Sequence, residues 1–441
     1  MEQKYRVYTN QECPDDSSIE KIDVTEKDRQ VLRTLATRFA EIASGEDMAI
    51  RKREWKALRD LKPERPMILF ETFSVSGFVT DEDLKCDHPI LRNVEKSMLY
   101  PIKQYDELKD DIVLEKYLRL AWQIHRSNYG VDIVEKQADN SMAYMSNFPI
   151  QTPDDLKKLK KRDFSVDREK TLYLKSVLEE IFGDLLPVHV GNYDNFFRDL
   201  GFNPFVGLNT TVFTMDLFKL IGNENLLSWP FEHPEALTEI LEFLMDDRRR
   251  FLKWLKDETI LTLNSDNQHA GPSGYGYVSE LPDLNSDIEV DYKDCWCWVE
   301  SQETNLFSPK MFDEWFLPYL ADYANYFGLV SYGCCEPVYD RIEFVKKAIP
   351  KLRTVSISAW NNFEKAAEIL GKEYVFCSKP NPAFISGEKP FWESAKKDIE
   401  HIFACTRNQP VEFIYRDVYD VGGDMSRLSK WVQMVKEVIG L

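Results

Sequence analysis

The sequence lacks any apolar stretch long enough to cross a membrane, and it lacks an excess of basic residues. No run of about 18 apolar residues occurs, so we expect no membrane-spanning helix. The first five residues include no apolar segment of the kind that begins a secretory signal. Lys and Arg total 56 against 75 Asp and Glu, a net charge of -19. Nucleic-acid binding requires a basic surface, so we expect instead a cytoplasmic protein that acts on a small molecule.

Common nucleotide-binding motifs, short internal repeats and low-complexity tracts are also missing. No Gly-x-Gly-x-x-Gly follows an apolar segment and no P-loop is present, so nucleotide sites of those two kinds have no support. Hydrophobic residues make up 43% of the 441 residues, which is enough for a sizeable core. Cysteines of a cytoplasmic protein are expected to be thiols; the eight here are residues 13, 86, 295, 297, 334, 335, 377 and 405.

From about residue 290 onward, segments typical of strands and helices alternate five times. The predicted strands in this part are residues 294–299, 329–332, 354–358, 374–377 and 411–417. Such alternation predicts parallel strands joined by crossover helices. Earlier strands are predicted at 67–71, 142–145, 186–190 and 260–263. The total of about eight favours a closed (β/α)8 TIM barrel over an open sheet.

The first 64 residues differ from the rest of the chain. They are polar and charged, with apolar residues at helical spacing between 27 and 60, so we expect an N-terminal helical extension. Two prolines within 62–66 end it, and the barrel is expected over residues 65–441. Helices are also predicted at 106–128, from 152 and at 234–256.

Two strand ends carry the residue types that barrel enzymes use at the carboxyl ends of strands. Residues 300–303 read Glu-Ser-Gln-Glu, a group that could bind a metal, hold a proton or orient a substrate. A solvated loop explains these residues equally well. Residues 333–336 read Gly-Cys-Cys-Glu, and a thiolate beside a carboxylate suits zinc. Ordinary packing of small buried cysteines is the alternative.

Two further strand ends and one loop are weaker candidates. Cys377 could be another ligand, although packing explains it better, and Lys379 could meet an anionic group. Arg416 and Asp417 end the last strand, where the pair could be structural or could position a substrate. The polar loop at 264–277 contains His269, which could complete a metal site or simply face solvent.

At these residues the chain resembles the uroporphyrinogen decarboxylase superfamily, over roughly residues 65–441. That superfamily includes cofactor-free porphyrinogen decarboxylases and zinc-dependent corrinoid methyltransferases. The chain is most similar to bacterial decarboxylase-like proteins that carry three segments: Glu-Ser-Gln-Glu, Tyr-Gly-Cys-Cys-Glu-Pro and Lys-Pro-Asn-Pro-Ala. Here these are residues 300–303, 332–337 and 379–383. The resemblance implies a TIM barrel with its active site at the strand ends.

The two branches of the superfamily imply different sites. The decarboxylases bind substrate carboxylates through an Arg-rich segment after the first strand, whereas residues 70–77 here contain no Arg. The methyltransferases hold zinc through a His-x-Cys at one strand end and a later Cys. On this sequence Tyr332 stands at the His position, Cys334 at the first Cys, and Cys377 near the later one. The remaining ligand is implied to come from Cys335, Glu336, Glu300, Glu303 or His269.

We therefore expect a corrinoid-linked methyltransferase in which zinc activates a small substrate, such as a methoxylated aromatic or a methylamine. The methyl group would pass to or from the cobalt of a separate corrinoid-binding protein. A cofactor-free decarboxylase or lyase is the alternative, and it needs cations at the mouth. A non-catalytic barrel that binds a small molecule or a corrinoid protein is the third interpretation, and homodimer formation is left open.

The expected site residues fall into three sets. The catalytic candidates are Glu300, Gln302, Glu303 and His269. The substrate-binding candidates are Tyr332, Lys379, Asn381 and Arg416. The metal-ligand candidates are Cys334, Cys335, Glu336 and Cys377.

Overall fold

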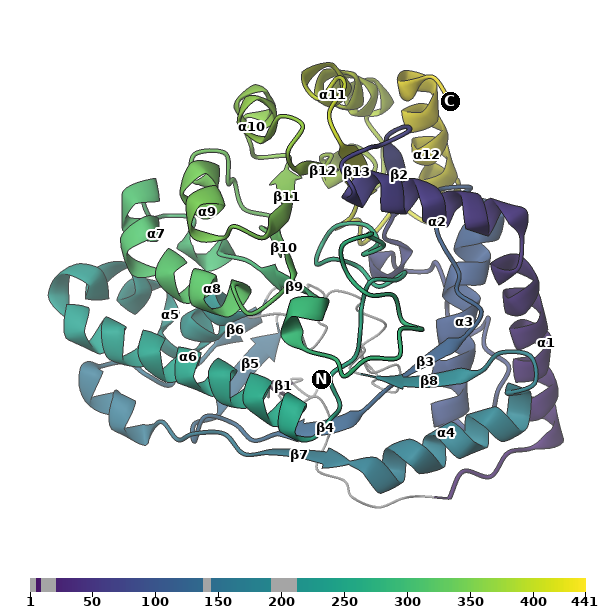
Figure 1. Cartoon of the computed structure of the whole chain (residues 1–441), viewed down its shortest axis with the longest axis horizontal. Coiled ribbons are helices and arrows are strands. Elements are labelled where there is room, and N and C mark those ends of the chain that lie inside the picture. Colours follow the sequence, from purple (N-terminus) through teal and green to yellow (C-terminus); the bar gives the residue numbers. More distant parts are fainter. Residues whose placement is uncertain (1–4, 9–20, 138–143, 192–211) are drawn as a thin grey trace.

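The protein is a mixed α/β structure built around a six-stranded parallel sheet (Figure 1). The computed structural model describes residues 5–8, 21–137, 144–191 and 212–441. The strands of this sheet lie in the order β2-β13-β12-β11-β10-β9. Their bounds are β2 (Met67–Phe70), β9 (Trp296–Val299), β10 (Leu329–Tyr332), β11 (Leu352–Ser358), β12 (Val375–Lys379) and β13 (Val411–Tyr415).

Helices from the second half of the chain cover one face of this sheet (Figure 1). Apolar side chains such as Val355, Phe376 and Phe413 point to that side and belong to the largest core cluster. The helix starts follow local sequence signals: the Ser308 hydroxyl accepts a hydrogen bond from the Met311 amide at 3.2 Å. The predicted alternation of strand and helix is confirmed. The helices are α7 (Pro309–Trp315), α8 (Leu317–Ala324), α9 (Ile342–Ala348), α10 (Phe363–Leu370), α11 (Trp392–Cys405) and α12 (Ser426–Ile439).

The opposite face of the sheet carries both polar and apolar side chains, and the end of α2 (Glu46–Arg59) reaches it. The N-terminal helices are α1 (Glu26–Ala43) and α2, so the predicted helical character of this region is confirmed. Arg59 at the end of α2 donates to Glu412 Oε2 at 2.9 Å and to Thr354 Oγ1 at 3.1 Å. A β-carbon on Gly274 would lie 2.2 Å from the Trp55 ring, so only glycine fits where this loop crosses α2.

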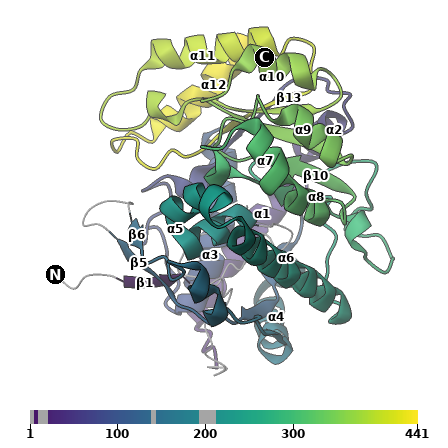
Figure 2. The same cartoon turned by 90° about the vertical axis from the view of Figure 1, so that its left-hand side faces the viewer.

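Shorter sheets lie beside the six-stranded one. β3 (Leu118–Ala121) pairs in parallel with β8 (Val188–Gly191), and β4 (Gln123–Arg126) pairs antiparallel with β7 (Phe164–Asp167). β1 (Tyr5–Tyr8), β5 (Ile133–Gln137) and β6 (Tyr144–Ser146) form an antiparallel sheet that Figure 2 places to one side. The remaining helices are α3 (Pro89–Glu107), α4 (Arg168–Phe182), α5 (Phe213–Glu232) and α6 (Pro234–Asp257).

Side chains rather than strands occupy both edges of the six-stranded sheet. On β2, the Ile68 amide donates to Asp111 Oδ2 at 2.7 Å and the Phe70 amide donates to Asp110 Oδ2 at 2.9 Å. On β9, the Asn264 side chain accepts from the Trp296 amide at 2.8 Å and donates back to its carbonyl at 3.0 Å. In the described part of the chain, no ladder joins the β3–β8 pair to this sheet. The closed barrel therefore stays a prediction.

Two predicted elements are wrong. Residues 106–128 are not a helix, because α3 ends at Glu107 and two strands, β3 and β4, occupy 118–126. Residues 260–263 do not form a strand, and Asn264, the residue after them, uses its side chain to pair with β9. The segment predicted from residue 152 is a short 3-10 helix, Pro153–Lys158. Residues 142 and 143 of another predicted strand lie outside the described residues.

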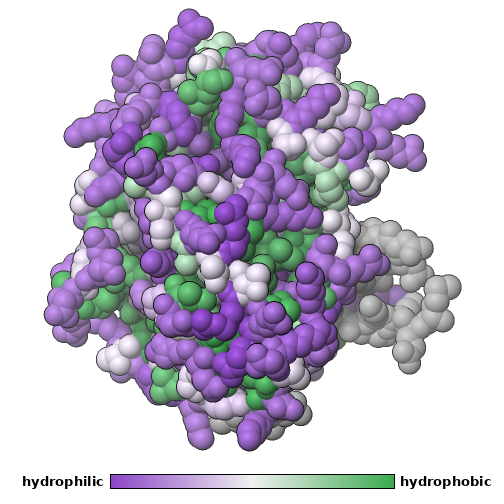
Figure 3. Space-filling model, turned by 90° about the vertical axis from the view of Figure 1, so that its right-hand side faces the viewer, coloured by the Kyte–Doolittle hydropathy of each residue, from purple (hydrophilic) through white to green (hydrophobic). Residues whose placement is uncertain are grey.

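The molecular surface agrees with the large share of charged residues in the composition. On the face shown in Figure 3, hydrophilic residues surround small apolar areas. Among the described residues, no helix combines the length and the apolar character that crossing a bilayer requires.

Candidate functional site

Polar side chains from distant parts of the sequence meet at the carboxyl ends of β2, β10, β12 and β13. Cys335, just after β10, has its sulfur 3.6 Å from Cys334 Sγ and 3.3 Å from Asp417 Oδ2. Asp417 follows β13 and adopts a positive φ of 60°, a conformation that Asp tolerates better than most residues. Parallel strands bring their carboxyl ends to one side of a sheet, which is why residues 82 positions apart in the chain can touch here.

The two neighbouring thiols differ in acidity. The hydrogen bond from the Cys334 thiol lowers the pKa of Cys335, and the positive charges of Lys379 and Arg416 lower it further. The same hydrogen bond, together with burial, raises the pKa of Cys334 well above its usual value. Cys335 is therefore the more acidic of the two thiols, and the Cys334 thiol stabilises its ionised form.

Two cations lie beside the thiols. Lys379, at the end of β12, donates to the Cys334 carbonyl at 2.7 Å, and only 4% of this lysine is exposed. Arg416, just after β13, has its Nε 3.4 Å from Glu71 Oε2 and 3.6 Å from Asp417 Oδ1. The structure thus brings together both cations that the sequence suggested for substrate binding. They give this side of the cluster the capacity to hold an anionic group.

Glu71 is a buried acid at the same place. It comes directly after β2, and burial raises its pKa to about 8, against the opposing effect of Arg416. Its Oε1 atom is buried and makes no hydrogen bond within the described part of the chain. Glu71 is therefore mostly protonated at neutral pH and has a proton to donate. The sequence analysis missed it, although an acid placed directly after an apolar strand was the available signal.

A second cluster, of carboxyl groups, lies beside the thiol cluster. The Thr214 hydroxyl, from α5, lies 3.1 Å from Glu300 Oε1 and 2.6 Å from Glu303 Oε2. Burial and then the charge of Glu303 raise the pKa of Glu300 well above its usual value, and burial also raises the pKa of Glu303. Gln302 contributes its backbone amide, which donates to Glu300 Oε2 at 2.9 Å. The two carboxyls can therefore share a proton.

Glu336 connects the two clusters. Its Oε2 accepts from the Cys334 amide at 2.8 Å, and its Oε1 accepts from the Ser301 amide at 3.2 Å. Glu336 is buried and thus holds the loop after β10 against the loop after β9. The Tyr332 hydroxyl lies 2.7 Å from Ser301 Oγ, and this tyrosine is fully buried. Both residues position the loops rather than present a free group.

Three other predicted site residues have different surroundings. Cys377 is buried in mid-strand, its thiol donates to the Pro272 carbonyl at 3.6 Å, and burial raises its pKa well above the usual value. Asn381 Oδ1 accepts from the Ala383 amide at 3.0 Å and so starts a turn of 3-10 helix. The His269 ring lies 2.7 Å from the Ser273 carbonyl, and burial lowers its pKa to about 4, which keeps it neutral.

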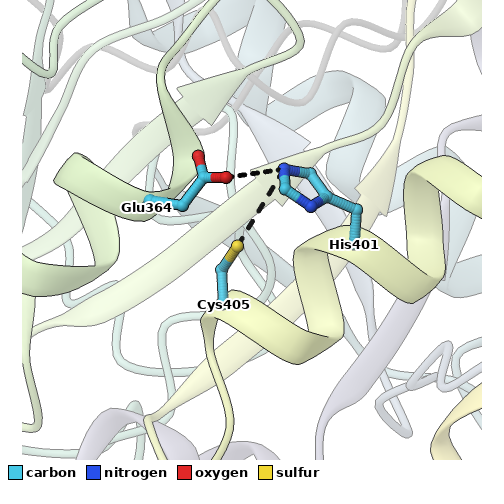
Figure 4. A group of neighbouring side chains, drawn as sticks. All are labelled: Glu364, His401 and Cys405. Atoms are coloured by element: carbon cyan, nitrogen blue, oxygen red, sulfur yellow. Dashed lines mark hydrogen bonds and ion pairs between the residues drawn. The ribbon is translucent and has the colours of Figure 1, made fainter.

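One group of metal-ligating side chains forms elsewhere, on the surface. Glu364 of α10 and His401 and Cys405 of α11 offer an oxygen, a nitrogen and a sulfur that lie within 4.8 Å of one another (Figure 4). Within the described ranges this is the only such group of three, so the predicted ligands at the strand ends do not form one. The sequence analysis missed it, although His401 and Cys405 stand four residues apart between two predicted strands, where the alternation implies a helix.

Comparison of the chain with models of protein families and with curated proteins gives no match. The chemistry at the strand ends therefore follows from its own side chains. They offer a thiol of lowered pKa at Cys335, a proton on Glu71, and two cations, Lys379 and Arg416. Such a set can bind a soft metal ion, protonate a leaving group and hold an anion.

Proposed function

We propose that this protein is a corrinoid-linked methyltransferase whose active site lies at the carboxyl ends of the parallel strands. The observation that carries the proposal is the placement of the Cys335 sulfur, 3.6 Å from Cys334 Sγ and 3.3 Å from Asp417 Oδ2. We also propose that β2, β3, β8 and β9 to β13 are the eight strands of one closed (β/α)8 barrel. Its support is that all eight belong to parallel pairs, six in one sheet and two beside it.

The two sulfurs already have the spacing of a zinc site. With Zn–S bonds of about 2.3 Å, two sulfurs of a tetrahedral site lie roughly 3.8 Å apart, close to the 3.6 Å between Cys334 and Cys335. Asp417 would supply an oxygen ligand in place of the Glu336 and Cys377 suggested by the sequence. Its oxygen and the two sulfurs do not all lie within 4.8 Å of one another, so a side-chain rotation would have to bring it in. A fourth position would be left for substrate. Two thiolates and a carboxylate carry three negative charges. The metal ion and the two neighbouring cations offset that charge, although those cations also weaken the attraction for the metal.

Bound zinc would supply Lewis acidity at the methyl donor. The chain supplies the remaining functions. In transfer from a methyl ether, the carbon–oxygen bond would break, and reduced cobalt of the partner's corrinoid would provide the electron pair of the new carbon–cobalt bond. The leaving oxygen takes a proton, for which Glu71 is placed because its pKa of about 8 keeps it protonated. Lys379 and Arg416 are suited to an anionic substituent of the substrate, and Glu300 with Glu303 to a polar one.

Methyl transfer to free cob(I)alamin tests this function. Zinc-loaded protein is mixed with methoxylated aromatics or methylamines, and formation of methylcobalamin is followed by its absorption. We expect turnover that Cys335→Ala abolishes and that Glu71→Gln slows at least about 100-fold. Cys405→Ser is the matched control outside the site and should keep full activity. Turnover that survives in Cys334→Ala/Cys335→Ala would overturn the proposal.

A cofactor-free decarboxylase or lyase is the second candidate, and the buried cations favour it. Arg416 and Lys379 could bind a substrate carboxylate, and Glu71 could protonate the carbon that keeps the electron pair when carbon dioxide leaves. Such an enzyme would work equally well after exhaustive treatment with a chelator. Loss of activity in Lys379→Met and Arg416→Met, with no dependence on metal, would favour this candidate over methyl transfer.

A further inference from the structure

We propose that α10 and α11 hold a divalent metal ion of the zinc type at a second, external site formed by Glu364, His401 and Cys405. The proposal is independent of the chemistry at the strand ends. His401 Nε2 lies 3.4 Å from Glu364 Oε1 and 4.0 Å from Cys405 Sγ. Figure 4 shows both side chains directed at that same nitrogen.

The fold places these three side chains before any ion binds. His401 and Cys405 are four residues apart in α11, so they lie on one face of the helix. Glu364 lies in the first turn of α10, the neighbouring helix on the outer side of the sheet. The Phe363 ring packs edge-on against the His401 ring at 5.9 Å and limits its rotation. An ion would therefore bind with little ordering of side chains, which favours binding.

The contacts are better explained by a cation than by direct hydrogen bonds. The ring nitrogen either donates to Glu364 or accepts from the Cys405 thiol, depending on the tautomer, so it cannot satisfy both partners at once. At 4.0 Å the contact between nitrogen and sulfur is at the limit for a hydrogen bond. Ligand atoms of a tetrahedral zinc site lie roughly 3.3–3.8 Å apart, and small side-chain rotations would bring these three to that spacing.

The donors and their exposure indicate the kind of ion and its role. Nitrogen, oxygen and thiolate sulfur together suit zinc, and cobalt(II) can report on the same ligands. The Glu364 and His401 side chains are 64% and 48% exposed, so water can fill the fourth position. Because the ligands come from two helices, the ion would clamp α10 to α11. It would stabilise the folded chain by mass action, since the unfolded chain does not hold the three groups together.

The test uses full-length Cys334→Ala/Cys335→Ala, in which the strand-end thiols are absent. We expect one equivalent of cobalt(II) to bind with a thiolate-to-cobalt charge-transfer band, and zinc to displace it and raise the melting temperature. In that background Cys405→Ala should abolish the band, while His401→Ala and Glu364→Gln should weaken zinc binding at least about tenfold. Glu368→Gln, an exposed acid one turn further along α10, is the matched control and should bind normally.

Two results would overturn this proposal. One is a double variant that binds neither cobalt(II) nor zinc while its circular dichroism matches that of the wild type. The other is zinc affinity that stays unchanged in His401→Ala and Cys405→Ala. The substituted side chains are at least partly exposed, so these variants are expected to fold, and circular dichroism of each one checks this.

Discussion

Cys335 owes its acidity to its neighbours, and this can be measured on protein freed of metal. We expect iodoacetamide to label Cys335 faster than Cys334 or Cys405 at pH 7, because only Cys335 has a lowered pKa among the three. Lys379→Met should move the labelling midpoint of Cys335 to higher pH, since this substitution removes a cation that lowers its pKa. Peptide mass spectrometry across a pH series measures both effects. Lys365→Met, at an exposed position, is the control, and a midpoint equal in both variants would contradict the assigned cause.

The raised pKa of Glu71 makes the stability of the folded chain depend on pH. Its pKa is about 8 in the folded chain against 4.5 for the ordinary side chain, so folding takes up a proton between these values. This favours the folded state below pH 4.5, and the advantage is lost as the pH rises through 8. Glu71→Gln removes this pH dependence. The free energy of unfolding of the variant minus that of the wild type should therefore rise by up to about 1.4 kcal/mol for each pH unit over that window. Urea unfolding at pH 5, 6, 7 and 8 measures the difference, and a constant difference would count against the raised pKa.

Single residues show how far sequence can predict a site. Cys334, Cys335, Lys379 and Arg416 were found because each follows a strand that is itself evident from the sequence. Asp417 was predicted only as a partner of Arg416, because the neighbouring sequence does not reveal which other strand end will lie beside it. Which thiol is the more acidic depends first on the hydrogen bond between the two thiols, and charges from β12 and β13 lower both pKa values; these contacts exist only in the folded chain. The neighbouring sequence reveals that a residue follows a strand, whereas the pKa of its side chain depends on residues that are distant in the sequence.

At the scale of elements, α2 is fixed to the sheet by one buried ion pair. Arg59 and Glu412 are both 0% exposed, with a 2.9 Å contact between them. Arg59→Met should lower the free energy of unfolding by about 3–5 kcal/mol, because Glu412 then keeps a buried charge without its partner. Arg53→Met on the same helix breaks a pair that is 60% and 50% exposed, and it should cost less than about 1 kcal/mol. Urea unfolding compares them, and equal effects would contradict this role of Arg59.

The elements after residue 290 could be predicted because their signals are local. Pro309 follows the Ser308 cap, and short apolar strands end in polar residues, so β10 was predicted with its observed bounds. The helix predicted at residues 106–128 is wrong because the structure of this segment depends on partners that are distant in the sequence. Asp110 and Asp111 bond to the edge of β2, and β3 pairs with β8 some 70 residues later. Helical spacing of apolar residues cannot reveal such pairing.

At the scale of the whole molecule, the parallel order of six strands makes a joint site out of separate loops. Residues after β2, β10, β12 and β13 are far apart in the chain, yet their side chains lie within a few contacts of Cys335. The sequence predicted parallel strands and a site at their carboxyl ends. It could not predict the edges of the sheet, where side chains of Asp110, Asp111 and Asn264 take the place of neighbouring strands.

The zinc content of protein purified without added metal or chelator tests the central claim most directly. Because the surface group could bind an ion of its own, the measurement is made in the His401→Ala background, with and without Cys335→Ala. The account predicts close to one zinc per chain in His401→Ala, measured by plasma mass spectrometry, and loss of that zinc when Cys335 is also replaced. A His401→Ala protein that holds no zinc, even after reconstitution, would contradict a metal-activated methyltransferase and would move the cofactor-free lyase to first place.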